Sequence, residues 1–427
     1  MLFYFVVILF ANIFDASSKR SDGQIRKEWN SLLKGYNRHI RPNYTGSATN
    51  VHLTIKIQSF REINERKMSY GIDIWMSQKW EDYRLKHNIS KVITPLLGLG
   101  RPSNLIWVPD TVFINEINSK QHLVTVRNNK VDINSDGTVH LISRVTVVAS
   151  CRMNFRFYPL DTQFCYLFIE SFAYPDTYVD YNWRVGVIVE KYDLSQYTLE
   201  KVETFKNISK YESGNYTILQ VMFRFKRGVE VSVIQVFFPI VSVVCVSMIS
   251  LWLNKYSTSS RVALCVTTLL TLCTLWTRVN FSLPLVSYFK ALDWYFLVSF
   301  VFILLVLVEY TIVVNVDTSR EKKKVKNAKK EEKRNSLKNA SLKETALDSA
   351  RSRKASEAPG APVNVKEVLK RKRKVKFDDY ETGTSRIDRV ARFLIPCSYF
   401  LYNIYFWFVF MDERHAYAAE HSRPIHK

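Results

Sequence analysis

The sequence predicts a membrane protein in which an extracellular antiparallel β-sandwich is followed by a bundle of four transmembrane helices. Three observations indicate this fold class. Short segments with alternating apolar and polar residues fill the first half of the chain, which is typical of half-buried strands. Four long apolar segments lie in the second half, and a strongly basic segment separates the last two. A chain of 427 residues is also longer than one hydrophobic core usually accommodates, so at least two domains are expected.

The N-terminus predicts export of the domain that follows it. Residues 1–18 contain a short apolar run that ends in small residues, which is typical of a signal peptide although no positive charge precedes the run. Residues 19–230 then form the expected extracellular domain. Four sequons for N-glycosylation lie in this domain and support the same sidedness. Their acceptors are Asn43, Asn88, Asn207 and Asn215.

The pattern of apolar residues in this domain indicates a β-sandwich. A short amphipathic helix is expected over residues 24–40, and the period changes to two at Val51, Leu53, Ile55 and Ile57. Turn signals separate the strand-like segments, as in all-β sandwiches. We expect further strands at 70–78, 123–126, 139–148, 164–170 and 217–225.

Four segments are apolar enough to cross a bilayer. The first has about 23 residues, which as a helix measures roughly 34 Å and exceeds the hydrocarbon thickness. Aromatic residues make up 14% of the chain, as is common where Trp and Tyr lie at membrane interfaces. The expected spans are residues 231–253, 261–280, 294–316 and 390–411, the first three forming a 231–316 block, with a short extracellular tail at 412–427.

The excess of positive charge is concentrated between the third and fourth spans. The chain has a net charge of +22, and residues 320–389 contain 23 Lys and Arg against 11 Asp and Glu. The positive-inside rule places the 317–389 loop in the cytoplasm, and its composition favours disorder at its centre. Both termini are then extracellular. A nucleic-acid-binding arm would explain the same charge, but membrane helices on both sides argue against nucleic acid as a partner.

The second span predicts a water-filled pore. Ser260 and Arg261 begin it, and steps of three or four residues then define a small or polar stripe with one leucine, which is a poor face for lipid. If several copies surround an axis, hydroxyl groups line the conduit and the leucine narrows it. Hydrogen bonds from the threonines back to the helix would explain the same pattern. The stripe is Ala263, Thr267, Leu270, Thr274 and Arg278.

The charges around this span favour an anion pore. Residues 254–292 contain no Asp or Glu, whereas Lys255, Arg261, Arg278 and Lys290 are present. Cation channels require acidic rings near their mouths, and basic residues favour anions. We therefore expect a chloride pore.

Cys151 and Cys165 enclose thirteen residues that include Phe157-Tyr158-Pro159-Leu160-Asp161. This pattern resembles the signature of the Cys-loop, or pentameric, transmitter-gated channels. The pore span and the following 283–293 segment are similar to glycine, GABA and invertebrate glutamate-gated chloride channels. Ser259-Ser260 departs from the Pro-Ala pair that is common in these relatives. The resemblance implies a homo- or heteropentamer at the plasma membrane, in a postsynaptic location.

The resemblance also implies roles for the Cys151–Cys165 loop. The two cysteines would form a disulfide, which for a loop of this length stabilises by roughly 3 kcal/mol. The loop would couple the ligand site to the pore by resting on the link after the pore span. Arg227, just before the first span, would pair with an acidic residue of the loop. The implied coupling residues are Phe157, Tyr158, Pro159, Asp161 and Arg227.

The transmitter site of this family lies between subunits and forms an aromatic cage for an ammonium group. On the principal face the resemblance implies Glu170, Ser171, Phe172, Tyr211, Ser213 and Tyr216. On the complementary face it implies Trp75 and Ser77. Val112 replaces a usual aromatic residue, and Ser77 replaces a usual Arg or Gln.

Because Ser77 carries no charge, the sequence does not decide which class of transmitter binds. We expect either an amine without a carboxylate or a subunit that supplies only the principal face, although Lys56 on the adjacent strand could still bind a carboxylate. GABA, glycine, glutamate and biogenic amines all remain candidates. A non-conducting auxiliary subunit and a cation channel are the alternative functions. No catalytic, metal-binding or cofactor-binding pattern is found, and no enzymatic activity is expected.

Overall fold

The computed structural model describes residues 27, 29–88, 92–94, 105–190, 194–253, 257–350 and 386–420. Side chains are described for all of these except 338–350, 386–387 and 413–420. The predicted signal peptide lies outside the described residues. The chain forms two compact units: one contains the strands together with Asn280–Lys290, and the other comprises Val233–Val279 and Ala291–Met411.

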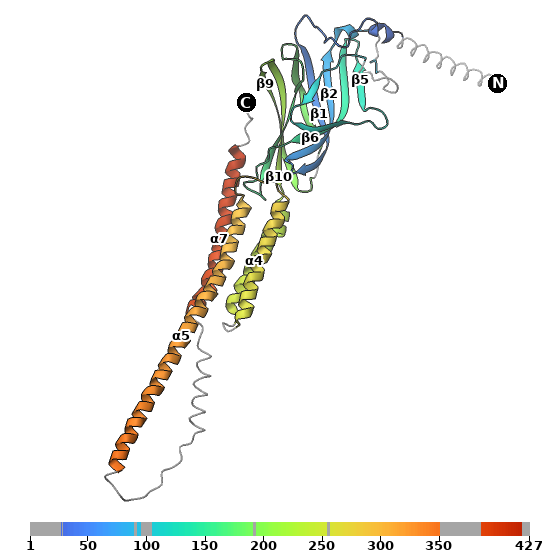
Figure 1. Ribbon diagram of the computed structural model, residues 1–427. Helices are drawn as coiled ribbons and strands as arrows, with labels where there is room; N and C mark the ends of the chain where they lie inside the picture. Colours follow the sequence, from blue (N-terminus) through green and yellow to red (C-terminus); the bar gives the residue numbers. More distant parts are fainter. Residues whose placement is uncertain are drawn as a thin grey trace, which may run out of the picture. The chain divides into compact units, whose positions relative to one another are not determined.

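Two sheets form the β-sandwich (Figure 1). The first sheet has the order β4-β6-β2-β1-β8, and β5 also pairs with β6. Its strands are β1 (Thr49–Asn64), β2 (Ser69–Glu81), β4 (Glu116–Gln121), β5 (Asn129–Ile133), β6 (Thr138–Ser150) and β8 (Val179–Val189). The second sheet has the order β3-β7-β10-β9. Its strands are β3 (Thr111–Phe113), β7 (Thr162–Ser171), β9 (Tyr197–Tyr211) and β10 (Gly214–Arg227).

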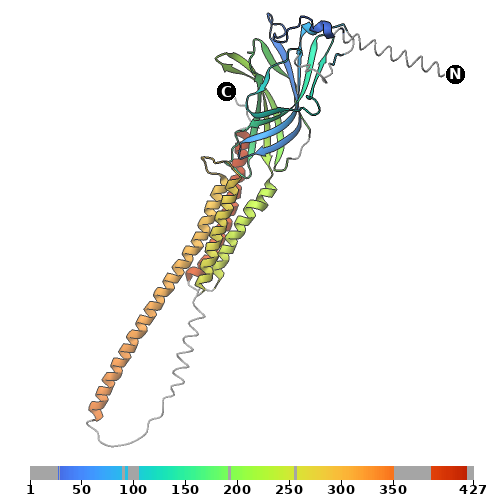
Figure 2. The ribbon, with the colours of Figure 1, turned by 45° about the vertical axis from the view of Figure 1, so that its right-hand side comes forward.

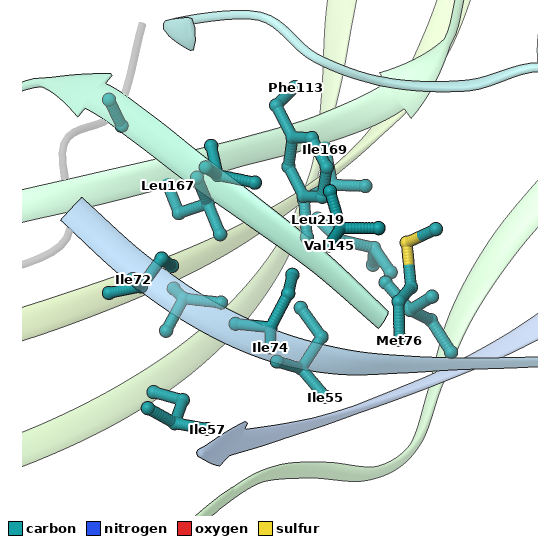
Figure 3. Close-up of a cluster of buried hydrophobic side chains, with 14 of the residues drawn as sticks. Ile55, Ile57, Ile72, Ile74, Met76, Phe113, Val145, Leu167, Ile169 and Leu219 are labelled. Carbon is teal, nitrogen blue, oxygen red and sulfur yellow. The ribbon is translucent and has the colours of Figure 1, made fainter. Parts of the chain in front are cut away.

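The core lies between the two sheets. The alternating residues that predicted the first strand all face inward: Val51, Leu53, Ile55 and Ile57 are at most 1% exposed. Figure 3 shows Ile72 and Ile74 of β2 near Leu167, Ile169 and Leu219 of the second sheet. Because side chains alternate along a strand, burying one face leaves the other face free for polar and ligand-contacting residues.

Three strand and helix predictions need correction. β1 and β8 run parallel, so the sandwich is not antiparallel throughout. Residues 123–126 form a bend instead of a strand, and Leu123 and Val124 are exposed, so a short apolar run was a false strand signal. The N-terminal helix ends earlier than predicted: Lys27 and residues 29–33 are helical, residues 34–35 form a turn, and Trp29, Leu32 and Leu33 pack against the core.

Four helices of the described chain are long and apolar enough to cross a membrane. The first runs from Val229 to Trp252 as α2 (Val229–Ser232), a π-helical turn (Val233–Phe237), α3 (Phe238–Ile249) and a 3-10 turn (Ser250–Trp252). The others are α4 (Thr258–Phe281), α5 (Ala291–Ala350) and α7 (Arg386–Glu420). The last three include the spans predicted from the sequence, and the first ends one residue before the end of its predicted span.

The helix α5 extends well beyond the predicted third span (Figure 2). Its 60 residues continue through the first part of the basic loop, for which disorder near the centre was expected. Residues 317–350 contain neither Gly nor Pro and are rich in Lys, Glu and Ala, which have high helix propensity. Residues 351–385, which include the centre of the loop, lie outside the described residues.

Aromatic and polar contacts hold α5 and α7 together. The Tyr295 hydroxyl donates to Asn403 Oδ1 at 2.6 Å, and the Ser299 and Tyr399 hydroxyls lie 3.3 Å apart. The ring of Phe302 packs edge-on against Tyr399. In a bilayer, such interhelical hydrogen bonds and close ring packing drive helix association, because lipid is as apolar as the side chains.

Candidate functional site

The end of the second sheet carries an aromatic and acidic cluster. Tyr211 ends β9 and Tyr216 lies near the start of β10, on either side of a tight hairpin that contains Gly214 with a φ of 132°. The two rings pack edge-on with centroids 5.4 Å apart. The Tyr211 hydroxyl is 3.4 Å from both carboxylate oxygens of Glu170, and the Ser213 and Tyr216 hydroxyls are 3.2 Å apart.

The Glu170 carboxyl is suited to binding a cation. Burial raises the pKa of Glu170 above its ordinary value, while its hydrogen bond with Tyr211 opposes that rise. A half-desolvated carboxylate beside two phenol rings attracts an ammonium group through charge and cation–π interactions. Val112 pairs with Glu170 across β3 and β7, so the aliphatic residue noted in the sequence does border this cluster.

Phe172 and Ser171 lie in different environments. Phe172 is 78% exposed, so its ring is available to a ligand or to a neighbouring subunit. Ser171 is buried; its hydroxyl donates to Asp110 Oδ1 at 2.6 Å and accepts from the Tyr174 amide at 2.9 Å. The expectation that Ser171 contacts ligand is therefore corrected. It holds the loop that presents Phe172, because its side chain is already committed to internal hydrogen bonds.

The outer face of the first sheet carries a second cluster. Trp75 of β2 pairs directly with Lys56 of β1 and with Arg144 of β6, so all three side chains lie on one face. The Arg144 guanidinium lies 5.8 Å from the Trp75 ring centroid. Lys56 forms a 2.7 Å ion pair with Glu190. Arg144 was not predicted as a site residue; the cross-strand register is what places it beside Trp75.

Ser77 lies one step further along the same face. Its hydroxyl is 2.7 Å from His140 Nε2. Burial lowers the pKa of His140 below its ordinary value, and the nearby Arg184, Lys79 and Lys130 lower it further, against the opposing effect of Asp132. Ser77 is therefore already bonded within the subunit, and the positive charge of this face comes from Arg144 and Lys56 instead.

The glycosylation acceptors differ in exposure. Asn43, Asn88 and Asn215 are exposed, whereas Asn207 is half-buried. The alternation of side chains along β10 places Asn215 on the face opposite Tyr216. A glycan on Asn215 would therefore project away from the aromatic cluster.

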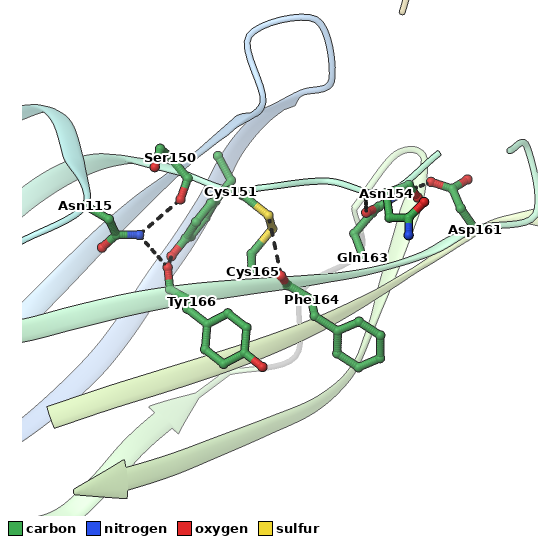
Figure 4. The surroundings of a disulfide bond; sticks show 10 residues. Asn115, Ser150, Cys151, Asn154, Asp161, Gln163, Phe164, Cys165 and Tyr166 are labelled. Carbon is green, nitrogen blue, oxygen red and sulfur yellow. Dashed lines mark hydrogen bonds between the residues drawn. A yellow bond between two sulfur atoms is a disulfide. The ribbon is translucent and has the colours of Figure 1, made fainter. Parts of the chain in front are cut away.

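Cys151 and Cys165 form the expected disulfide (Figure 4). It joins the end of β6 to β7. Near it, the Asn115 amide donates to the carbonyl groups of Ser150 and Tyr166, at 3.0 and 2.8 Å. These bonds fix the start of the loop to both sheets of the sandwich.

The Asp161–Arg227 ion pair suggested by the sequence is present. Arg227 Nε donates to Asp161 Oδ1 at 2.6 Å, and both side chains are buried. Arg227 Nη1 also lies 2.5 Å from Glu65 Oε1, in the β1–β2 turn. Its guanidinium lies over the rings of Tyr158 and Tyr197. These interactions raise the pKa of Arg227, against the opposing effect of burial.

The Asn280–Lys290 segment belongs to the same compact unit as this cluster. The Phe155 amide donates to the Tyr288 hydroxyl at 2.9 Å, and Tyr158 hydrogen-bonds with Ser282. Leu283 is 4% exposed within the hydrophobic core cluster. Phe157 is buried. The Cys151–Cys165 loop therefore packs against the link that follows α4, as the sequence suggested.

The predicted pore stripe is exposed on α4. Ala263, Thr267, Thr274 and Arg278 are exposed, and Leu270 is 65% exposed. Thr267 and Thr274 also donate to carbonyl groups one turn earlier, at 3.0 and 2.8 Å. The opposite face of the helix is buried, through residues Arg261, Cys265, Thr268 and Leu272.

Arg261 is placed differently from the expectation. Its side chain is 1% exposed and contacts the 3-10 turn Ser250–Trp252, α5 and α7, so it does not lie with the exposed Ser260 on the stripe. The periodicity explains this, because Arg261 is in phase with the buried Cys265 and Thr268. Its predicted contribution to a basic ring in the pore is therefore corrected.

Two family models match the chain. The model of the neurotransmitter-gated ion-channel ligand binding domain matches residues 26–229, and the model of the transmembrane region matches residues 236–377. Together they cover more than half of the sequence. The chain belongs to the neurotransmitter-gated ion-channel family. As in that family, an extracellular β-sandwich is followed by transmembrane helices in a multi-pass membrane protein.

Two curated relatives in this family are GABA receptor subunits. The chain is 38% identical over 312 residues to the "Gamma-aminobutyric acid receptor subunit beta-like" of Drosophila melanogaster, covering 70% of the chain and 63% of that protein. It is 38% identical over 285 residues to the "Gamma-aminobutyric acid receptor subunit beta" of Caenorhabditis elegans, covering 66% and 52%. The alignments thus span about half to two thirds of these relatives.

Proposed function

We propose that this chain is a subunit of a pentameric transmitter-gated chloride channel in the plasma membrane, with both termini extracellular and a postsynaptic location. The observation that carries the proposal is the pair of clusters on the two sheets. One presents a carboxylate among aromatic rings, and the other presents cations beside a tryptophan. In a ring of subunits, the first cluster of one copy meets the second cluster of its neighbour.

The two clusters favour an amino-acid transmitter of the GABA type. Glu170, Tyr211 and Phe172 suit the ammonium group, and Arg144 with Lys56 suits the carboxylate. The Arg144 guanidinium lies beside the Trp75 ring, on the sheet face that also carries Lys56. Because Ser77 lacks a charge, the sequence left open either an amine without a carboxylate or a subunit that supplies only the principal face. The position of Arg144 removes that reason.

Opening requires no covalent chemistry. A ligand that binds the open arrangement more tightly than the closed one shifts the population toward the open state. The Arg227 cluster and the link after α4 transmit this change, and separation of the Leu270 rings allows chloride to pass. Relatives named as GABA receptor subunits are consistent with this assignment.

Recordings with matched ligands test this proposal. Cells expressing the chain, alone and with a related subunit, receive GABA and an amine of the same length that lacks the carboxylate. We expect a current with GABA, and Arg144→Gln should raise its half-activating concentration by about tenfold, as for the loss of a charged hydrogen bond. Arg38→Gln, an exposed arginine outside both clusters, serves as the control.

An equal response to both ligands would contradict the carboxylate site. A current only in the presence of the related subunit would assign the chain to heteropentamers. No current in either case would favour a non-conducting auxiliary subunit.

A further inference from the structure

A buried ion cluster joins the end of the first membrane helix, α4 and α7 within the second compact unit. It contains Arg261 at the start of α4 and two residues of α7, Asp388 and Arg392. Arg261 and Asp388 are each at most 1% exposed. The gating mechanism proposed above uses none of these charges, and each is costly to bury without a partner.

The two arginines cap the end of the first membrane helix. Arg261 Nε donates to the Leu253 carbonyl at 3.1 Å, and Nη2 donates to the carbonyl groups of Leu253 and Leu251. Arg392 Nε also donates to the Leu251 carbonyl, at 2.9 Å. The last carbonyl groups of a helix lack intrahelical partners and carry partial negative charge. The guanidinium groups donate hydrogen bonds to these carbonyl groups and offset their charge.

Asp388 is the shared counterion of the two arginines. Arg392 Nη2 donates to Asp388 Oδ2 at 2.7 Å, and Arg261 Nη1 lies 3.6 Å from Asp388 Oδ1. The contact between Arg261 and Asp388 is therefore an ion pair, but it is too long for a hydrogen bond. The Arg261 guanidinium also lies 5.3 Å from the Tyr310 ring centroid on α5. One side chain at the base of α4 thus contacts each of the other three helices.

We infer that Arg261 is a positioning residue that fixes the base of the pore helix, with Asp388 as its required counterion. It does not act as a charge in the permeation path. The guanidinium fork matters because it reaches two carbonyl groups, one carboxylate and one ring at once, which a lysine ammonium cannot do. The inference rests on the proposed function, in which α4 lines the pore.

Comparison of Arg261→Lys with Arg261→Gln separates the two roles. For a positioning residue, both variants lose the fork, so both should shift the half-activating agonist concentration by about fivefold or more. Both should also retain the chloride-to-sodium permeability ratio. For a pore charge, Arg261→Lys should resemble the wild type and Arg261→Gln should lose selectivity. That second pattern would overturn the inference.

The counterion is tested by a double variant. Asp388→Asn should shift activation in the same way, and its effect should be non-additive with Arg261→Gln, because the double variant removes both members of the pair. Strictly additive effects would contradict the role of Asp388.

Surface labelling keeps the test decisive if single variants fail to assemble. Asp388→Asn leaves both Arg261 and Arg392 without their counterion, whereas the double variant leaves only Arg392 without it. The double variant should therefore reach the cell surface in larger amount than Asp388→Asn. Equal loss in both would contradict the pairing. Because labelling requires no agonist response, it also distinguishes failure of this inference from failure of the proposed function.

Discussion

At the residue scale, the site is defined by side chains from strand ends that are far apart in sequence. The aromatic residues of the β9–β10 hairpin and the end of β7 could be predicted, because the family pattern fixes their spacing. The sequence could not show that the Ser171 hydroxyl bonds Asp110 or that Arg144 lies beside Trp75. Whether a serine faces a ligand or an internal aspartate, and which arginine lies beside Trp75, depend on strand register and on side-chain rotamers.

Truncating Tyr216 should weaken transmitter binding. Its ring forms one wall of the cluster and holds the Tyr211 ring edge-on. The loss of a desolvated cation–π contact is worth about 2 kcal/mol, or roughly thirtyfold in affinity. Tyr216→Ala should therefore raise the half-activating concentration by that order. Tyr44→Ala, an exposed tyrosine outside the clusters, provides the control. An unchanged response would remove Tyr216 from the site.

Acidification should reduce agonist sensitivity through Glu170. Burial raises the pKa of this carboxyl, so its charged form is lost at a higher pH than for an exposed glutamate. An ammonium ligand requires that charge, so the half-activating concentration should rise as the pH falls through the raised pKa. Concentration–response curves from neutral to mildly acidic pH measure this effect. If Glu170→Gln leaves the pH dependence intact, another group is responsible.

At the element scale, most strands and all four spans could be predicted, because alternation and apolar length are local signals. The parallel pairing of β8 with β1 could not be predicted, since strand order depends on how distant segments dock. The false strand at 123–126 and the extension of α5 had local causes. One was an apolar run too short to pack, and the other was high helix propensity in a segment whose charge suggested disorder.

The Asp161–Arg227 pair should be required for coupling between the sandwich and the link after α4. Removing one partner of a buried pair costs about 3–5 kcal/mol when the other charge is left alone, and the loss here should be smaller because Glu65 still pairs with Arg227. Asp161→Asn should therefore reduce maximal current or surface expression. Surface labelling separates the two effects.

Glu200→Gln, which breaks the more exposed pairs of Glu200 with Arg224 and Lys226 in the same sheet, is the control and should have little effect. Normal gating by a surface-expressed Asp161→Asn variant would show that the pair is dispensable for coupling.

At the scale of the whole molecule, the two compact units carry different parts of the proposed mechanism. The transmitter clusters and the Arg227 cluster lie in the unit of the sandwich, together with Asn280–Lys290. The exposed stripe of α4 and its buried anchor lie in the other unit. All charged side chains in the described residues 257–292 are basic, which supports the proposed selectivity for anions.

The most direct test of this account is the reversal potential of the transmitter-evoked current. Extracellular chloride is replaced stepwise by a large impermeant anion at constant sodium concentration. The account predicts a shift of the reversal potential by about 59 mV per tenfold change in chloride, as for a monovalent ion. A reversal potential that ignores chloride and follows sodium instead would contradict the proposal that this family member is an anion channel.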